Sequence, residues 1–363
     1  MKKILILSNH HSYTYNLRKE IIQELISNGY KVTLVLPYGE KVDKLKKMGC
    51  DFIDLPLDRR GINPVNDLKL LLSYIKIMKK IKPDLVMSYT IKPNIYGGIS
   101  TRILKIPFLP NVTGLGSAVK RKGLFQKIMT ILHRIAFKNA NCVFFQNKAN
   151  KDFFVANQLV KENFKIIPGS GINLEEFSLT EYPKEKDELN LLFIGRIMKD
   201  KGIEELIKAA QILNEQNIKV NFDAIGFYEG EYAKRVKELD QSNLITFHGS
   251  TNDVKDFIKK SHAVILPSHH EGMANVLLEA AAMGRPILGS LIPGCQETFK
   301  EGVTGYGFEP GNVDSLLQAI YRFLKLSYEQ KIEMGKQGRK KIVLEFDRQE
   351  IVSEYVKIIK NIL

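Results

Sequence analysis

The chain has 363 residues, a length that favours two domains of ordinary size, each with a core of its own. Hydrophobic residues make up 44% and charged residues 26% of the sequence, which excludes wholesale disorder, and no apolar run reaches the roughly 18 to 20 residues of a membrane-spanning helix. The net charge of +14 is concentrated in the first half, because residues 1–182 hold 29 Lys or Arg against 14 Asp or Glu. This asymmetry predicts an anionic partner for that half: lipid headgroups, a diphosphate or nucleic acid.

Short apolar runs alternate with longer amphipathic segments through the first half of the chain. The runs are dense in Val, Ile, Leu and Phe without polar alternation, which is typical of parallel strands covered on both faces. Helices are predicted between the runs, for example over 16–28 and 66–80. The predicted strands span residues 3–8, 31–36, 84–89, 107–112, 142–146 and 165–168.

The second half repeats this alternation after a polar break at 180–188, where we expect a linker. The predicted domains are 1–182 and 183–347, and a final helix over 348–363 could pack on either of them. Strands are predicted over 190–195, 220–226, 244–247, 263–267 and 286–289, with helices over 201–216, 276–283 and 313–324. The predicted fold class is α/β, with two doubly wound, Rossmann-like domains that bind ligands at the carboxyl ends of their strands.

The first strand of the second domain ends in a motif of glycines and cations. Gly195 and Arg196 close the strand, and Lys201 and Gly202 lead into the next helix. A strand end, two cations and a helix N-terminus together suit a diphosphate. Arg196 can donate a fork of hydrogen bonds to phosphate oxygens, while Lys201 supplies a compact positive charge. Taken alone, a turn with two solvated cations explains this motif equally well.

Two glutamates eight positions apart, Glu271 and Glu279, follow the strand predicted at 263–267. Glu271 is expected in the loop and Glu279 about one turn into the next helix. The backbone N–H groups of residues 272–274 can bind an anion at the start of that helix. We expect the Glu279 carboxylate to accept hydrogen bonds from the hydroxyl groups of a ribose, and the Glu271 carboxylate to accept them from those of a hexose. A helix-capping glutamate and a surface glutamate are the alternative interpretation of the pair.

The glycine–cation motif followed by the two glutamates resembles the retaining glycosyltransferases of family four. That family has the GT-B fold, in which two Rossmann-like domains face a central cleft. The first half resembles the branch that acts on polyprenyl-diphosphate-linked sugars in capsule and glycan assembly, which includes N-acetylgalactosaminyltransferases. The further segments that carry the resemblance, in chain order, are 89–97, 112–117, 145–147, 169–177, 247–249 and 267–268.

The resemblance implies a retaining enzyme that transfers a hexosyl group, in particular an N-acetylhexosaminyl group. The donor would be a UDP-sugar and the acceptor a polyprenyl-diphosphate-linked saccharide, with no cofactor and no divalent metal. Catalysis would involve Arg196 and Lys201 at the diphosphate and Glu271 at the donor sugar. The sequence contains no Asp-x-Asp pair, a common site for a metal that bridges a diphosphate. The expected donor contacts are Gly195, Arg196, Lys201, Glu271, Gly272, Met273, Ala274, Asn275 and Glu279.

The first domain is expected to bind the acceptor. Many relatives have a His after the fifth strand, where this chain has Thr113 and Gly114. His10 and His11 could line the acceptor side or cap a loop. The residues assigned to the acceptor and membrane side are His10, His11, Lys92, Thr113, Gly114, Lys120, Arg121 and Lys122.

A basic, amphipathic segment predicts contact with an anionic membrane. Between Asp84 and Asp152 the sequence has eleven Lys or Arg and no acidic residue, and the run 120–122 leads into the apolar and basic segment 124–138. Such a segment can lie on an anionic bilayer, although an ordinary core helix has the same apolar pattern. The three cysteines show no metal-ligand or redox spacing, which is typical of proteins in a reducing compartment. Together with the basic segment, this predicts a cytoplasmic protein at the inner face of the membrane.

Two other functions fit part of the sequence. A UDP-sugar 2-epimerase has a similar fold and binds the same nucleotides, but it acts on the donor alone, and the two motifs favour transfer. A nucleic-acid-binding protein is suggested only by the basic charge, without a recognisable reading motif. We therefore expect no nucleic-acid partner.

Overall fold

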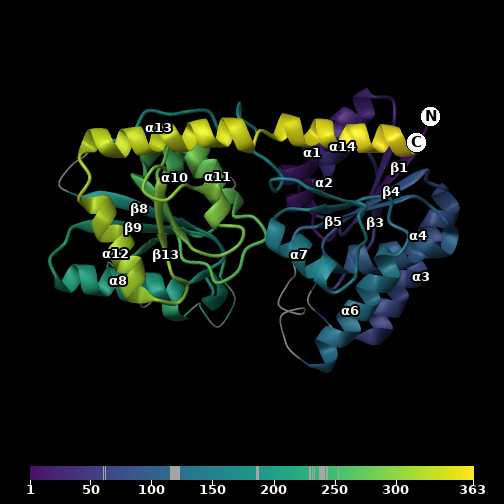
Figure 1. Ribbon diagram of the computed structural model, residues 1–363, viewed down its shortest axis with the longest axis horizontal. Coiled ribbons are helices and arrows are strands. Elements are labelled where there is room, and N and C mark those ends of the chain that lie inside the picture. Colours follow the sequence, from purple (N-terminus) through teal and green to yellow (C-terminus); the bar gives the residue numbers. More distant parts are fainter. Residues whose placement is uncertain are drawn as a thin grey trace. The chain divides into compact units, whose positions relative to one another are not determined.

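A computed structural model of the chain describes residues 1–59, 61, 63–114, 123–184, 188–228, 230, 232, 234–236, 242, 244–251 and 253–363. The chain forms two compact units (Figure 1). The N-terminal unit consists of Met1–Ser170 and Arg348–Leu363, and the C-terminal unit of Gly171–Asp347.

The N-terminal unit is built on a seven-stranded parallel sheet with the strand order β3-β2-β1-β4-β5-β6-β7. In β1 the side chains alternate between the two faces, so that Ile4 and Ile6 join one buried cluster and Leu5 and Leu7 the other. The strands are β1 (Lys3–Leu7), β2 (Lys31–Leu36), β3 (Asp51–Asp54), β4 (Leu85–Tyr89), β5 (Phe108–Val112), β6 (Val143–Phe145) and β7 (Phe164–Ile166).

Helices cover both faces of this sheet, as the all-apolar strands require. The first buried cluster receives α1 (His11–Ser27), α2 (Val42–Lys47) and α14 (Arg348–Ile362). The second receives α3 (Pro64–Ile81), α6 (Leu124–Phe137) and α7 (Lys148–Ala156), and a short π-helix, η1 (Pro93–Gly97), with α4 (Gly98–Leu104) packs between α3 and α6.

The last helix, α14, belongs to the N-terminal unit and lies beside α1 (Figure 1). Arg348 donates hydrogen bonds to the Glu20 carboxylate at 2.9 and 3.0 Å. The ring of Tyr355, fully buried, lies 4.2 Å from that of Phe144 on β6. An apolar stripe of α14 thus completes the core on one face of the sheet.

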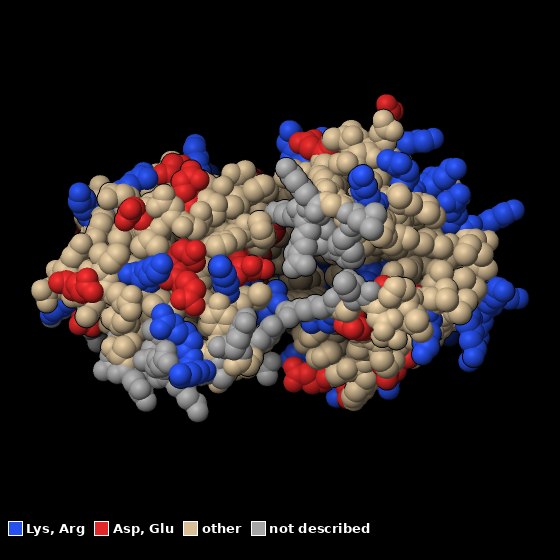
Figure 2. Space-filling view, turned by 90° about the horizontal axis from the view of Figure 1, so that it is seen from below, with Lys and Arg blue, Asp and Glu red and all other residues tan. Residues whose placement is uncertain are grey.

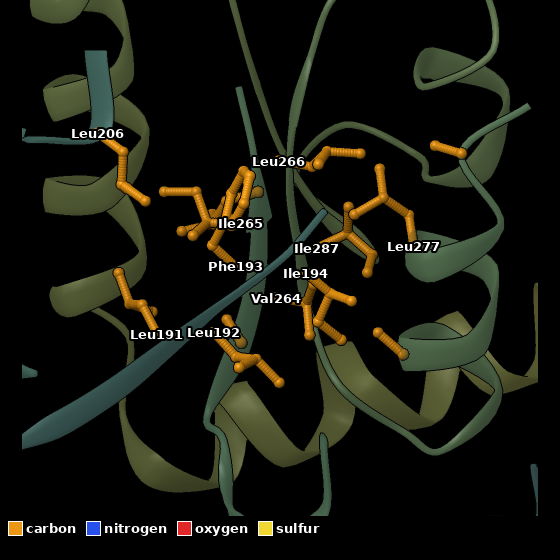
Figure 3. Close-up of a cluster of buried hydrophobic side chains, with 14 of the residues drawn as sticks. Leu191, Leu192, Phe193, Ile194, Leu206, Val264, Ile265, Leu266, Leu277 and Ile287 are labelled. Atoms are coloured by element: carbon orange, nitrogen blue, oxygen red, sulfur yellow. The ribbon is translucent and has the colours of Figure 1, made fainter. Parts of the chain in front are cut away.

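The C-terminal unit has a six-stranded parallel sheet with the order β10-β9-β8-β11-β12-β13 and one large buried core, part of which Figure 3 shows. In that view the side chains of β8 and β11, among them Phe193 and Ile265, lie between Leu206 of α8 on one side and Leu277 of α11 on the other. The strands are β8 (Leu189–Ile194), β9 (Val220–Ile225), β10 (Thr246–Phe247), β11 (Ala263–Leu266), β12 (Ile287–Ser290) and β13 (Gly305–Phe308). The helices are α8 (Ile203–Glu215), α10 (Lys255–Lys260), α11 (Asn275–Ala282), α12 (Val313–Leu324) and α13 (Tyr328–Glu345), with 3-10 turns η2 (Lys199–Lys201) and η3 (Gln296–Thr298).

The boundary between the units lies before residue 171, earlier than the predicted boundary at 182/183. Ile172 is fully buried in the C-terminal core, and its N–H donates to the Phe346 carbonyl at 2.8 Å. Arg285, which is fully buried, donates to Thr180 Oγ1 at 2.9 Å and to the Glu181 carbonyl at 2.8 Å. These bonds attach the start of the polar segment 180–188 to the C-terminal unit, and burial lowers the pKa of Arg285 to about 10.

Candidate active site

The predicted donor residues gather at the point where the strand order of the C-terminal sheet reverses. β8 and β11 are neighbours in this sheet, and the chain builds the sheet outward from them in opposite directions. In doubly wound folds, ligands bind at the carboxyl ends of the strands that flank such a point. Residues 195–202 follow β8 and residues 267–274 follow β11, so both predicted motifs lie there.

Glycine allows the loop after β8 to pack against the loop after β11. Gly202 has φ +71°, and a Cβ at this position would lie 1.9 Å from the carbonyl oxygen of Pro267. Only glycine adopts this conformation without strain and also leaves room for that carbonyl. Gly202 thus brings the residue before it, Lys201, close to the second motif.

Lys201 and Glu271 form an ion pair between the two loops. The Oε1 atom of Glu271 accepts from Lys201 Nζ and also from Ser268 Oγ, the latter at 2.8 Å. Both charged side chains are mostly buried, with 18% of Lys201 and 13% of Glu271 exposed. Partial burial strengthens the attraction between them relative to an exposed pair. The structure therefore brings together two of the four charged residues that the sequence predicted.

His269 and Glu205, which the sequence analysis did not single out, hold the same two loops together. The N–H of His269 donates to the Asp200 carbonyl at 2.9 Å, and His269 Nε2 lies 3.0 Å from Glu205 Oε1 at the start of α8. The second oxygen of Glu205 is buried without a hydrogen-bond partner among the described residues. The adjacent histidines at 269 and 270 were visible in the sequence, but their distance in sequence from Glu205 concealed this contact.

The start of α11 follows Glu271 closely and has no side-chain cap. Its N-cap, Ala274, has no side-chain hydrogen bond, and no acidic residue lies in the first turn. The carboxamide oxygen of Asn275 is buried without a partner in the described part of the chain. An anion or a ligand hydroxyl would compensate these groups. Glu279, half-buried, lies one turn into this helix.

One predicted anion contact needs correction. The N–H of Ala274 donates to the Gly294 carbonyl at 2.7 Å, so it is already engaged and does not face a ligand freely. Gly294 belongs to the loop after β12 and has φ +89°, and a Cβ there would come within 2.9 Å of the Glu271 carbonyl. This third loop supports the second motif. The other predicted donor residues, Gly195, Arg196, Gly272 and Met273, lie in the loops after β8 and β11.

The predicted acceptor residues of the N-terminal unit have mixed roles. His10 caps α1, because its Nδ1 accepts from the Ser12 N–H at 3.1 Å, and burial, with the charge of Arg59, lowers its pKa to about 4. Lys92 is engaged in an ion pair of 2.7 Å with Asp67.

The remaining acceptor predictions are distributed as follows. His11 Nδ1 lies 3.2 Å from Ser12 Oγ. Thr113 and Gly114 lie after β5 and are half-buried. Lys120, Arg121 and Lys122 lie outside the described residues.

A cavity of about 900 Å³ lies elsewhere, at the amino ends of the C-terminal strands. Tyr182, Asn190 and His262 line it, and none of the predicted site residues does so. Within the described ranges, no three His, Cys, Asp or Glu side chains are grouped so as to hold a metal ion.

Comparison with known proteins identifies both units. A "Glycosyl transferase 4-like" model matches residues 3–147, and a "Glycosyl transferases group 1" model matches residues 175–341. The chain is a glycosyltransferase, with a group 1 domain in its C-terminal unit and a 4-like domain in its N-terminal unit. These comparisons support neither the epimerase nor the nucleic-acid-binding alternative.

Relatives of this glycosyltransferase match over most of its length. The N,N'-diacetylbacillosaminyl-diphospho-undecaprenol alpha-1,3-N-acetylgalactosaminyltransferase of Campylobacter jejuni is 28% identical over 99% of this chain and 100% of that protein. The capsular polysaccharide biosynthesis glycosyltransferase CapM of Staphylococcus aureus is 28% identical over 82% of this chain and 81% of its own length.

Solved structures show that the glycosyltransferase has the GT-B fold. HepE of Anabaena in complex with UDP-glucose superimposes with a TM-score of 0.81 at 17% identity, covering 99% of this chain and 100% of that one. A glycosyltransferase of Rickettsia africae gives a TM-score of 0.79 at 20% identity, covering 99% and 98%. In the part of the chain that the structure describes, no helix has the length and apolar character needed to cross a membrane.

Proposed function

We propose that the chain transfers an N-acetylhexosaminyl group from a UDP-sugar to a polyprenyl-diphosphate-linked saccharide, with retention at the anomeric carbon and without a divalent metal. The names of two relatives support this substrate class. The Campylobacter jejuni relative is an N-acetylgalactosaminyltransferase that acts on an undecaprenol-diphosphate-linked sugar, and an Escherichia coli relative is a galactosyltransferase that acts on another. The observation that carries the proposal is the mostly buried Lys201–Glu271 pair at the reversal point of the C-terminal sheet.

In this proposal, fixed positive charge stabilises the leaving diphosphate. Lys201 and Arg196 contact the phosphate oxygens, and the uncapped start of α11 adds its partial positive charge. Glu271 holds Lys201 in position before the donor binds, and its carboxylate then accepts a hydrogen bond from a hydroxyl group of the donor sugar. Glu279, one turn further along α11, accepts from the ribose. Because these groups are held by packed loops, they need little reorganisation when charge develops.

A transfer assay tests the proposal. The purified chain is incubated with a panel of UDP-sugars and a short polyprenyl-diphosphate glycan, and the products are identified by mass spectrometry and the new linkage by NMR. We expect one extra N-acetylhexosamine, an α-linkage from an α-linked donor, and undiminished rates in EDTA. An inverted linkage or abolition by EDTA would refute the corresponding part. Epimer formation from UDP-N-acetylglucosamine alone would refute the transferase.

Variants of the loop after β8 test the role of its cations. Lys201→Met and Arg196→Met should each weaken the binding of UDP, measured by calorimetry, by about ten-fold, because each removes one charge-assisted contact. Lys199→Met is the matched control, since Lys199 lies in the same loop but is exposed. Equal effects of the three variants would contradict the assignment.

We further propose that the N-terminal unit works on an anionic membrane surface, where a polyprenyl-linked acceptor resides. Two of its helices expose apolar stripes with the same i, i+3, i+7 spacing, while their opposite faces are buried. Isolated exposed apolar residues are common, whereas grouped ones mark interaction surfaces, and α4, which packs against both α3 and α6, exposes Ile103 as well. The exposed fractions are 60% for Val65, 55% for Leu68 and 56% for Leu72 on α3, 57% for Ile103 on α4, and 43% for Ile128, 52% for Ile131 and 37% for Ile135 on α6.

The charges around these stripes are complementary to anionic lipid. The sequences of α3, α4 and α6 contain seven Lys or Arg and one acidic residue, Asp67, which pairs with Lys92. Figure 2 shows this unit in its right half, with Lys and Arg along the right-hand edge. Each basic residue near an anionic membrane contributes about 1 kcal/mol to the free energy of membrane binding.

Vesicle flotation tests the membrane part. The chain should float with vesicles of phosphatidylglycerol and phosphatidylcholine and less with phosphatidylcholine alone. Leu68→Asp with Ile131→Asp should abolish flotation, whereas Leu344→Asp should not, because Leu344 is 73% exposed on α13 of the other unit. Wild type that does not float, or equal loss in the control, would refute this surface. If the double Asp variant still floated but differed from wild type in sedimentation without vesicles, the apolar surface would instead mediate contact between copies of this chain.

A further inference from the structure

The N-terminal sheet has a reversal point of its own, and unsatisfied polar groups gather there. β1 and β4 are neighbours, and Leu7 pairs with Ser88 in their register. Two residues beyond this pair, Asn9 follows β1 and Thr90 follows β4, so the two stand at corresponding positions at the carboxyl edge of the sheet. Neighbouring strands lie about 5 Å apart, which puts both residues within reach of one ligand.

Asn9 and Thr90 each bury a polar atom that lacks a hydrogen-bond partner. Among the described residues, nothing donates to the carboxamide oxygen of Asn9 or bonds to the hydroxyl of Thr90. Buried polar groups are nearly always paired in folded proteins, so each orphan marks a place where a ligand or water completes the pairing. Two orphans at one sheet edge indicate a built site.

The backbone at Thr90 is strained. Its φ is +74°, a left-handed conformation that β-branched residues rarely adopt. The π-helix η1 begins three residues later, at Pro93. Strained residues and π-turns concentrate where a side chain must be aimed at a ligand. A glycine would relieve the backbone strain at this position. A need for the hydroxyl group of Thr90 would explain why a threonine is present instead.

A buried cation lies over the ring of the residue that precedes Thr90. Arg18 on α1 is 6% exposed, and its guanidinium lies 4.3 Å above the ring of Tyr89, the residue before Thr90. Within the described chain no carboxylate forms an ion pair with Arg18, and the nearby Glu20 pairs with Arg348. Burying a charge without an opposite charge is costly. An anion bound here would offset that cost.

Two other polar side chains at this edge are already engaged. Thr14 donates to Ser8 at 2.8 Å, and His10 caps α1. Among the described residues, the groups that remain are a hydrogen-bond acceptor from Asn9, the hydroxyls of Tyr89 and Thr90, and the positive charge of Arg18. This combination fits a ligand that carries both hydroxyls and an anionic group.

We propose that Asn9, Thr90 and Arg18 form a glycosyl-phosphate site in the N-terminal unit. Asn9 and Thr90 bind sugar hydroxyls, and Arg18 attracts the phosphate. This inference rests on the proposed function for the source of the ligand, because both the UDP-sugar and the polyprenyl-linked acceptor contain a glycosyl phosphate. Steady-state kinetics distinguish the two sources through the KM of each substrate.

Two variants of Thr90 separate binding from structure. Thr90→Val removes the hydroxyl and keeps the branched shape, whereas Thr90→Gly removes both the hydroxyl and the strain. We expect the KM for one substrate to rise about ten-fold in both, since each loses the same hydrogen bonds, while Thr90→Gly keeps or raises Tm. Thr101→Val is the matched control, because the buried Thr101 hydroxyl donates to the Gly98 carbonyl at 2.9 Å and serves α4 alone.

The results expected for the Thr90 variants can be told apart from a failure of the proposed transferase function. A raised KM for the acceptor or for the donor supports the site and names its source, and unchanged KM values for both in the two Thr90 variants overturn it. Calorimetry with N-acetylglucosamine 1-phosphate, in the presence of saturating UDP, applies even if wild type transfers no sugar. Binding by wild type and by Thr101→Val, but not by Thr90→Val, supports the site. Equal binding by all three, or by none, refutes it.

Discussion

Replacing Gly202 by alanine should separate the two loops that carry Lys201 and Glu271. The new Cβ would lie 1.9 Å from the Pro267 carbonyl oxygen, whereas an ordinary contact is at least 3.4 Å. The loops after β8 and β11 must therefore move apart by about 1.5 Å. A displacement of about 1 Å in a site can cost 100-fold in rate. We expect UDP affinity and turnover to fall by 10- to 100-fold.

A matched control isolates the clash from the backbone conformation. Gly302 lies in the same unit at φ +70°, against +71° for Gly202, but its Cβ would meet nothing within 4 Å. Both alanines should lose about 1–2 kcal/mol of unfolding free energy through the left-handed conformation. Gly202→Ala should lose about 1–3 kcal/mol more through overpacking.

Chemical denaturation and calorimetry with UDP measure both quantities in the two variants. Donor affinity should fall in Gly202→Ala and stay at the wild-type value in Gly302→Ala. If the two variants matched in both stability and affinity, close packing of these loops would not be what positions the Lys201–Glu271 pair.

Three other substitutions give separate outcomes. Arg285→Met should lower the unfolding free energy by more than about 3 kcal/mol in urea, because the carbonyls of Ile258, Lys259 and Glu181 lose the donor that the buried guanidinium supplies; a loss under 1 kcal/mol would contradict this role. His133 is buried and its pKa is lowered to about 4, so the unfolded chain binds its proton first and stability falls as pH drops from about 6.5 to 4. His133→Phe, which keeps the ring packing against Phe137 and Phe154, should flatten this slope by up to about 1.4 kcal/mol per pH unit, and an unchanged slope in urea denaturation would show otherwise. Glu279→Gln should raise the KM of the donor about ten-fold with Tm unchanged, whereas a drop in Tm with unchanged KM would make Glu279 a structural residue.

Most strands could be predicted because buried parallel strands are apolar on both faces, and two could not. β3, Asp51–Asp54, is an edge strand with an aspartate at each end and half-buried residues between them. β13 contains two glycines, which normally indicate a turn. A Cβ on Gly305 would lie 2.1 Å from the Ile287 carbonyl, so close approach to β12 requires glycine there. Neither the edge position of β3 nor the close approach of β13 to β12 produces an apolar run in the sequence.

The two motifs of the candidate site were predictable because each has its own pattern along the chain. Their contact was not, since Lys201 and Glu271 are 70 residues apart and pair only because β8 and β11 are neighbours. The same reason hid the link between His269 and Glu205. The engagement of Ala274 by Gly294 depends on a third loop, so only the folded chain shows which amides remain for a ligand.

The position of α14 affects how the chain folds during synthesis. Domains made first usually fold first, but one face of the N-terminal sheet here needs Ile351, Tyr355 and Ile359, which are translated after the entire C-terminal unit. Until then the nascent N-terminal unit exposes apolar surface that a chaperone can recognise. A nonsense mutation just before Arg348 would leave the C-terminal unit intact and its partner without a finished core.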